Sequence, residues 1–173
     1  EGRTFSCDGG GAVCEKPGGG EDYRDSYSGK MADFIAGLHF SDVPEDVVEK
    51  AKLLLLDTLG VALAAAREDF TGIVRDVARG MKGSPESSVW GSRERLPMAN
   101  AVLVNGTMAH GHDFDDMHRA ASSHMSVVAV PTALAVAENR KLSGRETLAA
   151  IVAGYEIGAR IGLAALGNLL TRG

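Results

Sequence analysis

Residues 110–124, with the sequence HGHDFDDMHRAASSH, hold four of the chain's five histidines and three aspartates. A carboxylate at the end of a helix beside a loop histidine can act as a general base or orient one, and a second histidine can act as an acid. Pairing His124 with Asp113 would suit removal of a proton next to a substrate carboxylate. The alternative interpretation is a solvated polar loop whose aspartates cap the next helix, because such residues usually lie on surfaces.

A metal site is the third interpretation of this segment. His110 and His112 are two residues apart, so on a helix they would point about 200° apart and could not share an ion. The zinc-protease motif is absent, and no glutamate stands at the twelfth position of an EF-hand loop. Aspartates with a distant histidine could still hold Mg²⁺ or Mn²⁺ for a hydrolase. The spacing fits no ligand rule well, so we expect no metal. No nucleophile or phosphate motif competes either, since G-x-S-x-G, a P-loop and G-x-G-x-x-G after a strand are absent.

The elements that must position the cluster follow a helical pattern from Met31 onward. Acidic residues and Pro44 precede a long apolar-periodic run, which is typical of the start of a helix. Further helices are predicted over about 70–81, from Pro97 through the start of the histidine-rich segment, over 126–139 and from 144 to about 165. SSVWG, residues 87–91, predicts at most one short strand. The fold class is therefore all-α.

The helix from Pro97 is predicted to end where the histidine-rich segment begins. His110 and Asp113 could then lie on its last turn, and residues 115–123 would form a loop. Ser143-Gly144-Arg145-Glu146 has the pattern of a capping box, with Ser143 as the N-cap and Glu146 at the third helical position. Small residues are frequent in the helix that follows, and they permit close approach of neighbouring helices.

Composition limits the class of function. The chain has 173 residues and a net charge of −5, with no block of lysine or arginine and only 5% aromatic residues. These values argue against nucleic acid as a partner. The apolar run over 53–66 is too short for a membrane span. The run over 148–170 contains Glu156 and Arg160, which are four residues apart and can therefore form an ion pair on one face of a helix. With no secretory h-region, we expect a cytoplasmic protein with no membrane contact.

Residues 1–30 differ from the rest of the chain. They are rich in glycine, serine and charge, and they cannot bury enough apolar surface to offset the entropy of ordering. We expect a disordered tail over 1–30 and a helical domain over 31–173. Cys7 and Cys14 lie in this tail and match no disulfide or zinc pattern.

Several segments together resemble the MmgE/PrpD family, in the family's order and from Met31 to about Ala165. They are PEDVVEKAKLLLLDTLGVALAAA, SSVWG with RLPMANAVLVNG, VNGTMAHGHDFDD followed by His124, VVAVPTALAVAE and SGRETLAAIVAGYEIGARIG. The resemblance implies a cofactor-independent lyase or isomerase on small di- or tricarboxylates, with 2-methylcitrate dehydration as the expected reaction. It also implies a homodimer, in which a large helical domain and a smaller α+β lid enclose the site.

The same resemblance assigns roles to individual residues. The first aspartate of the family's D-F-D-D motif falls on Asp113, and its loop histidine falls on His124; both are expected to be catalytic. Asp116, Met117 and His118 are expected to bind substrate. So is Ser126, at the end of a His-Met-Ser sequence where the family commonly has His-Pro-Ser. Met117 stands where the family often has threonine, and it cannot donate a hydrogen bond. These two departures leave the substrate open.

The family's second catalytic histidine, in a G-F-H motif, and its lid have no counterpart in these 173 residues. We therefore expect an N-terminal fragment that carries half a site, with little activity alone and with apolar helix faces exposed. The alternative is a non-catalytic helical module that self-associates.

Overall fold

The computed structural model describes the backbone of residues 25–172 and the side chains of residues 25–165. Among the described residues, those up to Gly37 form one unit, and those from Leu38 onward form a second. In the first unit, helix α1 spans Tyr27–Gly37 and so begins four residues before the predicted boundary at Met31. Residues 1–24 of the predicted tail, and with them both cysteines, lie outside the described residues.

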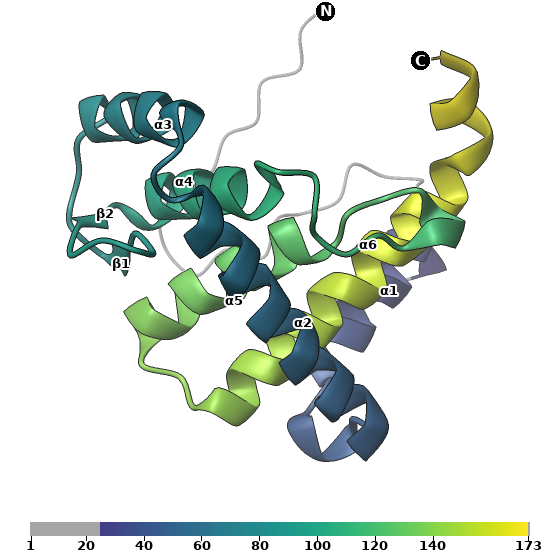
Figure 1. Cartoon of the computed structure of the whole chain (residues 1–173). Coiled ribbons are helices and arrows are strands. Elements are labelled where there is room, and N and C mark those ends of the chain that lie inside the picture. Colours follow the sequence, from purple (N-terminus) through teal and green to yellow (C-terminus); the bar gives the residue numbers. More distant parts are fainter. Residues whose placement is uncertain (1–24, 173) are drawn as a thin grey trace, which may run out of the picture. The chain divides into compact units, whose positions relative to one another are not determined.

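The second unit is almost entirely helical, which confirms the all-α fold class (Figure 1). Pro44 immediately precedes the long helix α2, as the sequence predicted. Helix α4 packs against α2, α3 and α5, and α5 packs against α6. The elements are η2 (Phe40–Asp42), α2 (Glu45–Ala65), α3 (Asp69–Gly80), α4 (Met98–His110), η3 (Arg119–Ala121), α5 (Ser126–Arg140) and α6 (Gly144–Arg172).

The expected short strand is present, but it has a partner that the sequence did not predict. β1 (Ser87–Ser88) pairs antiparallel with β2 (Arg95–Leu96), and each strand has only two residues. A two-residue strand is too short to show alternation in sequence. The hairpin depends on helix α4 instead: Asn105 Nδ2 donates to the carbonyl of Ser88, and Asn105 Oδ1 accepts from the backbone N–H of Trp90, both at 3.0 Å.

The main apolar core surrounds α4. Small side chains dominate it, which allows the helix axes to approach closely. Because α4 is buried along this core, its last residue, His110, has a fixed position. The buried members are Ala62, Ala65, Ala78, Val89, Leu96, Ala101, Val104, Met108 and Ala109.

Helix α6 begins with the predicted capping box. The hydroxyl of Ser143 accepts from the backbone N–H of Glu146 at 3.3 Å, and the Glu146 carboxylate accepts from the backbone N–H of Ser143 at 2.7 Å. The Glu146 carboxylate also accepts from the Ser143 hydroxyl at 2.7 Å. These hydrogen bonds hold the Glu146 carboxylate in its charged form and lower its pKa. The capping-box prediction is therefore confirmed.

Within the described residues, one stretch, Gly144–Ala165, is long and apolar enough to cross a membrane by length and composition alone, with a mean hydropathy of 1.4. The core helix of a globular domain can meet the same criterion. This stretch packs against α5 and α2, and Glu156 and Arg160 pair on it one turn apart, as their spacing predicted. The expected absence of membrane contact stays a prediction.

Candidate active site

The site loop, residues 111–125, leaves α4 by an abrupt turn. His110 is the last residue of α4, as predicted, but Asp113 is not on the helix. Asp113 has a φ of 51°, in the left-handed region that aspartate tolerates better than most residues, and its N–H donates to the carbonyl of His110 at 2.9 Å. The prediction that Asp113 lies on the last turn is therefore wrong, because this left-handed residue ends the helix.

Glycine allows α3 to support this turn. A Cβ at Gly111 would lie 2.4 Å from the ring of Phe70, which stands at the N-terminal end of α3. The edge of the same ring also approaches His112, with ring centroids 6.2 Å apart. The aromatic ring therefore fits against the end of α4 only because position 111 has no side chain.

The middle of the site loop folds back on itself through His118. The N–H of His118 donates to the carbonyl of Ser123 at 2.9 Å, and Nδ1 of His118 accepts from the N–H of Ala121 at 3.1 Å. Ser122 adopts a left-handed φ of 47°. The predicted loop over 115–123 thus contains the one-turn helix η3, and the reversal returns the chain toward α4 at His124.

The same part of the loop is anchored on α6. A Cβ at Gly162 would lie 2.8 Å from the Cβ of Ala121, and one at Gly158 would lie 2.5 Å from the sulfur of Met125. The phenol of Tyr155 donates to Asp116 Oδ2 at 2.5 Å. Burial, followed by this hydrogen bond and the charge of Asp116, raises the pKa of Tyr155 far above its usual value. One face of α6 therefore positions the loop.

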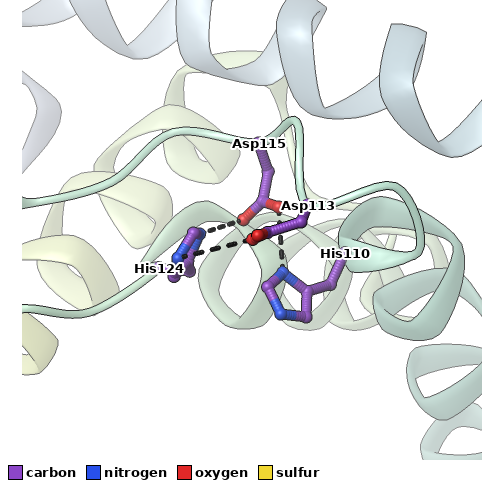
Figure 2. Close-up of side chains that lie close together, drawn as sticks. All are labelled: His110, Asp113, Asp115 and His124. Carbon is purple, nitrogen blue, oxygen red and sulfur yellow. Dashed lines mark hydrogen bonds and ion pairs between the residues drawn. The ribbon is translucent and has the colours of Figure 1, made fainter.

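The loop and α4 together form the His–Asp cluster, which consists of His110, Asp113, Asp115 and His124 (Figure 2). Asp115 lies at its centre: Oδ1 is 2.9 Å from Nδ1 of His110, and Oδ2 is 2.8 Å from Nδ1 of His124. The other ring nitrogen of His124, Nε2, lies 3.9 Å from Asp113 Oδ1. The two imidazole rings meet edge to face, with centroids 4.8 Å apart.

The members of the His–Asp cluster differ in how far their side chains are exposed to solvent. The Asp115 side chain is fully buried, His124 is 28% exposed and Asp113 is 80% exposed. A buried carboxylate is tolerated only with hydrogen-bond donors, and the two histidines supply them. The exposed sides of His124 and Asp113 face outward from this support, where a substrate can reach them.

This arrangement can support two kinds of chemistry. The four residues offer ligand atoms that all lie within 4.8 Å of one another, so nitrogen and oxygen donors of the types that bind divalent metals are close together. The sequence argument against a metal considered His110 with His112, whereas the fold brings His110 to His124. The partly exposed imidazoles supported by a carboxylate are also suited to proton transfer.

The fold places the six residues predicted from sequence in different surroundings. Asp113 and His124 come together in the His–Asp cluster. Asp116 and His118 instead contact Tyr155, by the hydrogen bond above and by ring centroids 6.3 Å apart. Met117 is half-exposed, and Ser126 is buried at the start of α5. Their expected roles in substrate binding stay predictions.

Two members of the cluster were missed. His110 was considered only as a metal ligand beside His112, and Asp115 was not distinguished from the aspartates around it. No local signal separates Asp115 from Asp113 and Asp116. Its distinguishing property is burial, which arises when the loop packs between α4 and α6.

The fold and the cluster together define a class of protein: an all-α domain with a carboxylate–histidine site in the loop that follows a buried helix. The family model for the MmgE/PrpD N-terminal domain matches residues 29–169. The chain is 32% identical over 152 residues to the cis-aconitate decarboxylase-like protein oryM of Aspergillus oryzae, covering 83% of this chain and 32% of that protein. It is 34% identical over 140 residues to human cis-aconitate decarboxylase, covering 79% of this chain and 29% of that enzyme.

The chain therefore belongs to the MmgE/PrpD family, and the resemblance noted in the sequence is confirmed. It spans about a third of the length of the curated relatives that it matches.

Proposed function

We propose that the chain carries the His–Asp part of the active site of a lyase that acts on small tricarboxylates such as cis-aconitate. The single observation that carries this proposal is the pair His124 and Asp113, supported from behind by the buried Asp115. The relatives named as cis-aconitate decarboxylases favour this substrate class.

Reactions of this class transfer a proton to or from a carbon atom next to a carboxylate. In decarboxylation of cis-aconitate, the bond to the departing carboxylate breaks, CO₂ leaves, and the electron pair moves through the allylic system to a carbon that takes a proton. In dehydration, a base removes a proton from such a carbon, and the hydroxyl leaves as water after protonation. We assign the proton transfer to His124 Nε2 in either case, with Asp115 orienting the ring through Nδ1 and Asp113 lying beside Nε2.

Decarboxylation is the first reaction to test, because it is named for the relatives. Dehydration of 2-methylcitrate, expected from the sequence, is the second. Both reactions use the same proton-transfer group, so the His–Asp cluster by itself does not distinguish them.

A tricarboxylate also needs cations. Within the described residues, no lysine or arginine forms an ion pair with Asp113 or Asp115. We propose that the 173 residues by themselves have little activity, because they span only about a third of the length of the relatives named as cis-aconitate decarboxylases. Preorganised donors on one side of a cleft are not sufficient for full catalysis.

The test is an assay of the protein expressed from the reading frame that contains this sequence. Turnover is followed by loss of cis-aconitate absorbance with release of CO₂, and separately by dehydration of 2-methylcitrate. We expect turnover of one of these acids, and a loss of about 100-fold or more in kcat for His124→Gln. His112→Gln, in the same loop but outside the cluster, is the matched control and should keep the wild-type rate. No turnover of either acid would overturn the proposal.

Exposed leucines favour a second role, the self-association expected as the alternative. Leu53, Leu56 and Leu63 lie on α2 with large exposed fractions, and Leu56 is 69% exposed. We expect Leu56→Glu to shift the chain toward monomer in light scattering after size exclusion. Val128→Glu, at an equally exposed residue of α5 (66%), is the control. A wild-type chain that is monomeric throughout would remove this candidate.

A further inference from the structure

One carboxylate in the site serves two imidazoles. Both oxygens of Asp115 are used, one for Nδ1 of His110 and one for Nδ1 of His124, at 2.9 and 2.8 Å. Ionised aspartate only accepts hydrogen bonds, so each Nδ1 must carry a hydrogen and donate it. The hydrogen bond at one ring nitrogen fixes the state of the other.

This donor pattern leaves Nε2 of both rings without a hydrogen when the imidazoles are neutral. Nε2 of His110 has no hydrogen-bond partner among the described residues, and Nε2 of His124 approaches only Asp113, at 3.9 Å. Both atoms therefore hold a lone pair that can take a proton. Figure 2 shows the two rings on the same side of Asp115, each presenting its second nitrogen away from that carboxylate.

His110 also lies beside open space. It contributes to the wall of a groove between α4 and α5, together with Leu103, Gly106, Val127 and Val128. Half of its side chain is exposed. A small molecule that reaches His124 can thus be contacted by His110 as well, because the ring centroids are 4.8 Å apart.

The shared carboxylate also holds the two rings close together, with centroids 4.8 Å apart. The pair thus offers two separate Nε2 atoms to one bound molecule, so that one ring can act as an acid while the other acts as a base.

We propose that His110 is a second acid–base group of the site and that Asp115 is a positioning residue that keeps Nε2 of both histidines free. This assignment rests on the proposed lyase function for its chemical role, but the state of the two rings can be measured without any substrate.

The first test is ¹⁵N NMR of the imidazole nitrogens in the folded protein at a pH where the rings are neutral. We expect His110 and His124 to carry their hydrogen on Nδ1. His118 is an internal reference, because its Nδ1 accepts from the N–H of Ala121 and its hydrogen must therefore be on Nε2. In Asp115→Asn, one of the two cluster histidines should change to the Nε2–H form, since an amide offers only one accepting atom.

The second test is kinetic. His110→Gln should lower kcat by about 100-fold with a smaller change in KM, as expected for an acid–base group. His112→Gln is the matched control: its side chain has a similar exposed fraction (40% against 50%), and it lies near Glu68 rather than Asp115.

The outcomes separate the two proposals. Nε2–H on either cluster histidine of the wild-type protein would overturn this inference, whatever the activity. A wild-type rate in His110→Gln would overturn its catalytic part. Absence of turnover on any tricarboxylate, with both rings in the Nδ1–H form, would overturn the proposed function and leave the role of Asp115 in setting the rings intact.

Discussion

Asp115 and Asp116 are neighbours in sequence, but they belong to two differently built parts of the site loop. Asp115 faces α4 and receives hydrogen bonds from two partly exposed histidines. Asp116 faces α6 and receives one from the phenol of Tyr155. Because the two carboxylates face different helices, one short stretch supplies both a cluster side, which carries the His–Asp cluster, and an anchored side, which is held by α6.

The two sides are built by different means. The anchored side depends on close packing, with Ala121 and Met125 lying against glycines of α6. The cluster side depends on hydrogen bonds to Asp115, which leave His124 partly open to solvent beside the exposed Asp113. The packing against α6 therefore holds the loop in place, so that the His–Asp cluster can be accessible to solvent and still keep its geometry.

The largest effect on activity is expected when each of the two aspartates is replaced in turn. Asp115→Asn should lower kcat on the tricarboxylate substrate by about 100-fold or more, because the amide offers one accepting atom and leaves one of the two rings without the acceptor that sets it. Asp116→Asn keeps an acceptor for Tyr155 and should cost about tenfold or less. Steady-state kinetics on both variants measure this difference. Equal losses would show that the two carboxylates are not functionally distinct.

The packing of the anchored side against α6 can be disrupted by substituting one glycine. Gly162→Ala places a Cβ 2.8 Å from Ala121 Cβ and 2.9 Å from the carbonyl oxygen of Ala121, so it should destabilise the fold by about 1–3 kcal/mol. Gly60→Ala, on α2 with no atom within 4 Å, should instead stabilise by about 0.5–1 kcal/mol. Urea unfolding of both variants tests this, and a neutral Gly162→Ala would contradict the close packing.

The hydrogen bond between the loop and α6 should have a somewhat smaller effect. Tyr155→Phe removes the donor to Asp116, whose Oδ1 is already buried without a partner among the described residues. We expect a cost of about 1–2 kcal/mol, from leaving a buried acceptor unsatisfied. A double-mutant cycle with Asp116→Ala, which removes the acceptor, measures the coupling between the two side chains, and additive effects would argue against the contact.

The smallest effect is expected from alkaline pH. The pKa of Tyr155 is raised, mainly by burial, so the folded chain keeps the phenol proton at a pH where the unfolded chain, near its ordinary value of about 10, loses it. The stabilisation linked to this proton is therefore complete below about pH 10 and is lost as the pH rises further. Unfolding midpoints between pH 8 and 11 should fall more steeply for wild type than for Tyr155→Phe. Parallel slopes would contradict the buried phenol.

The helices were predictable because their signals are local. Pro44 before α2, the reciprocal bonds of Ser143 and Glu146, and the end of α4 at His110 each follow from residues within a few positions. Local geometry also explains one error: the left-handed turn at Asp113 is not distinguishable from one more helical residue by periodicity alone.

The sequence by itself determined the helical fold, the family, and the concentration of histidines and aspartates in residues 110–124, because these depend on residue type and short-range spacing. Only the tertiary structure decided which of three aspartates is buried and which two histidines it joins. That choice depends on α4 ending at His110 and on α6 offering Gly158 and Gly162 to the loop, so that contacts distant in sequence turn Asp115 inward and Asp113 outward.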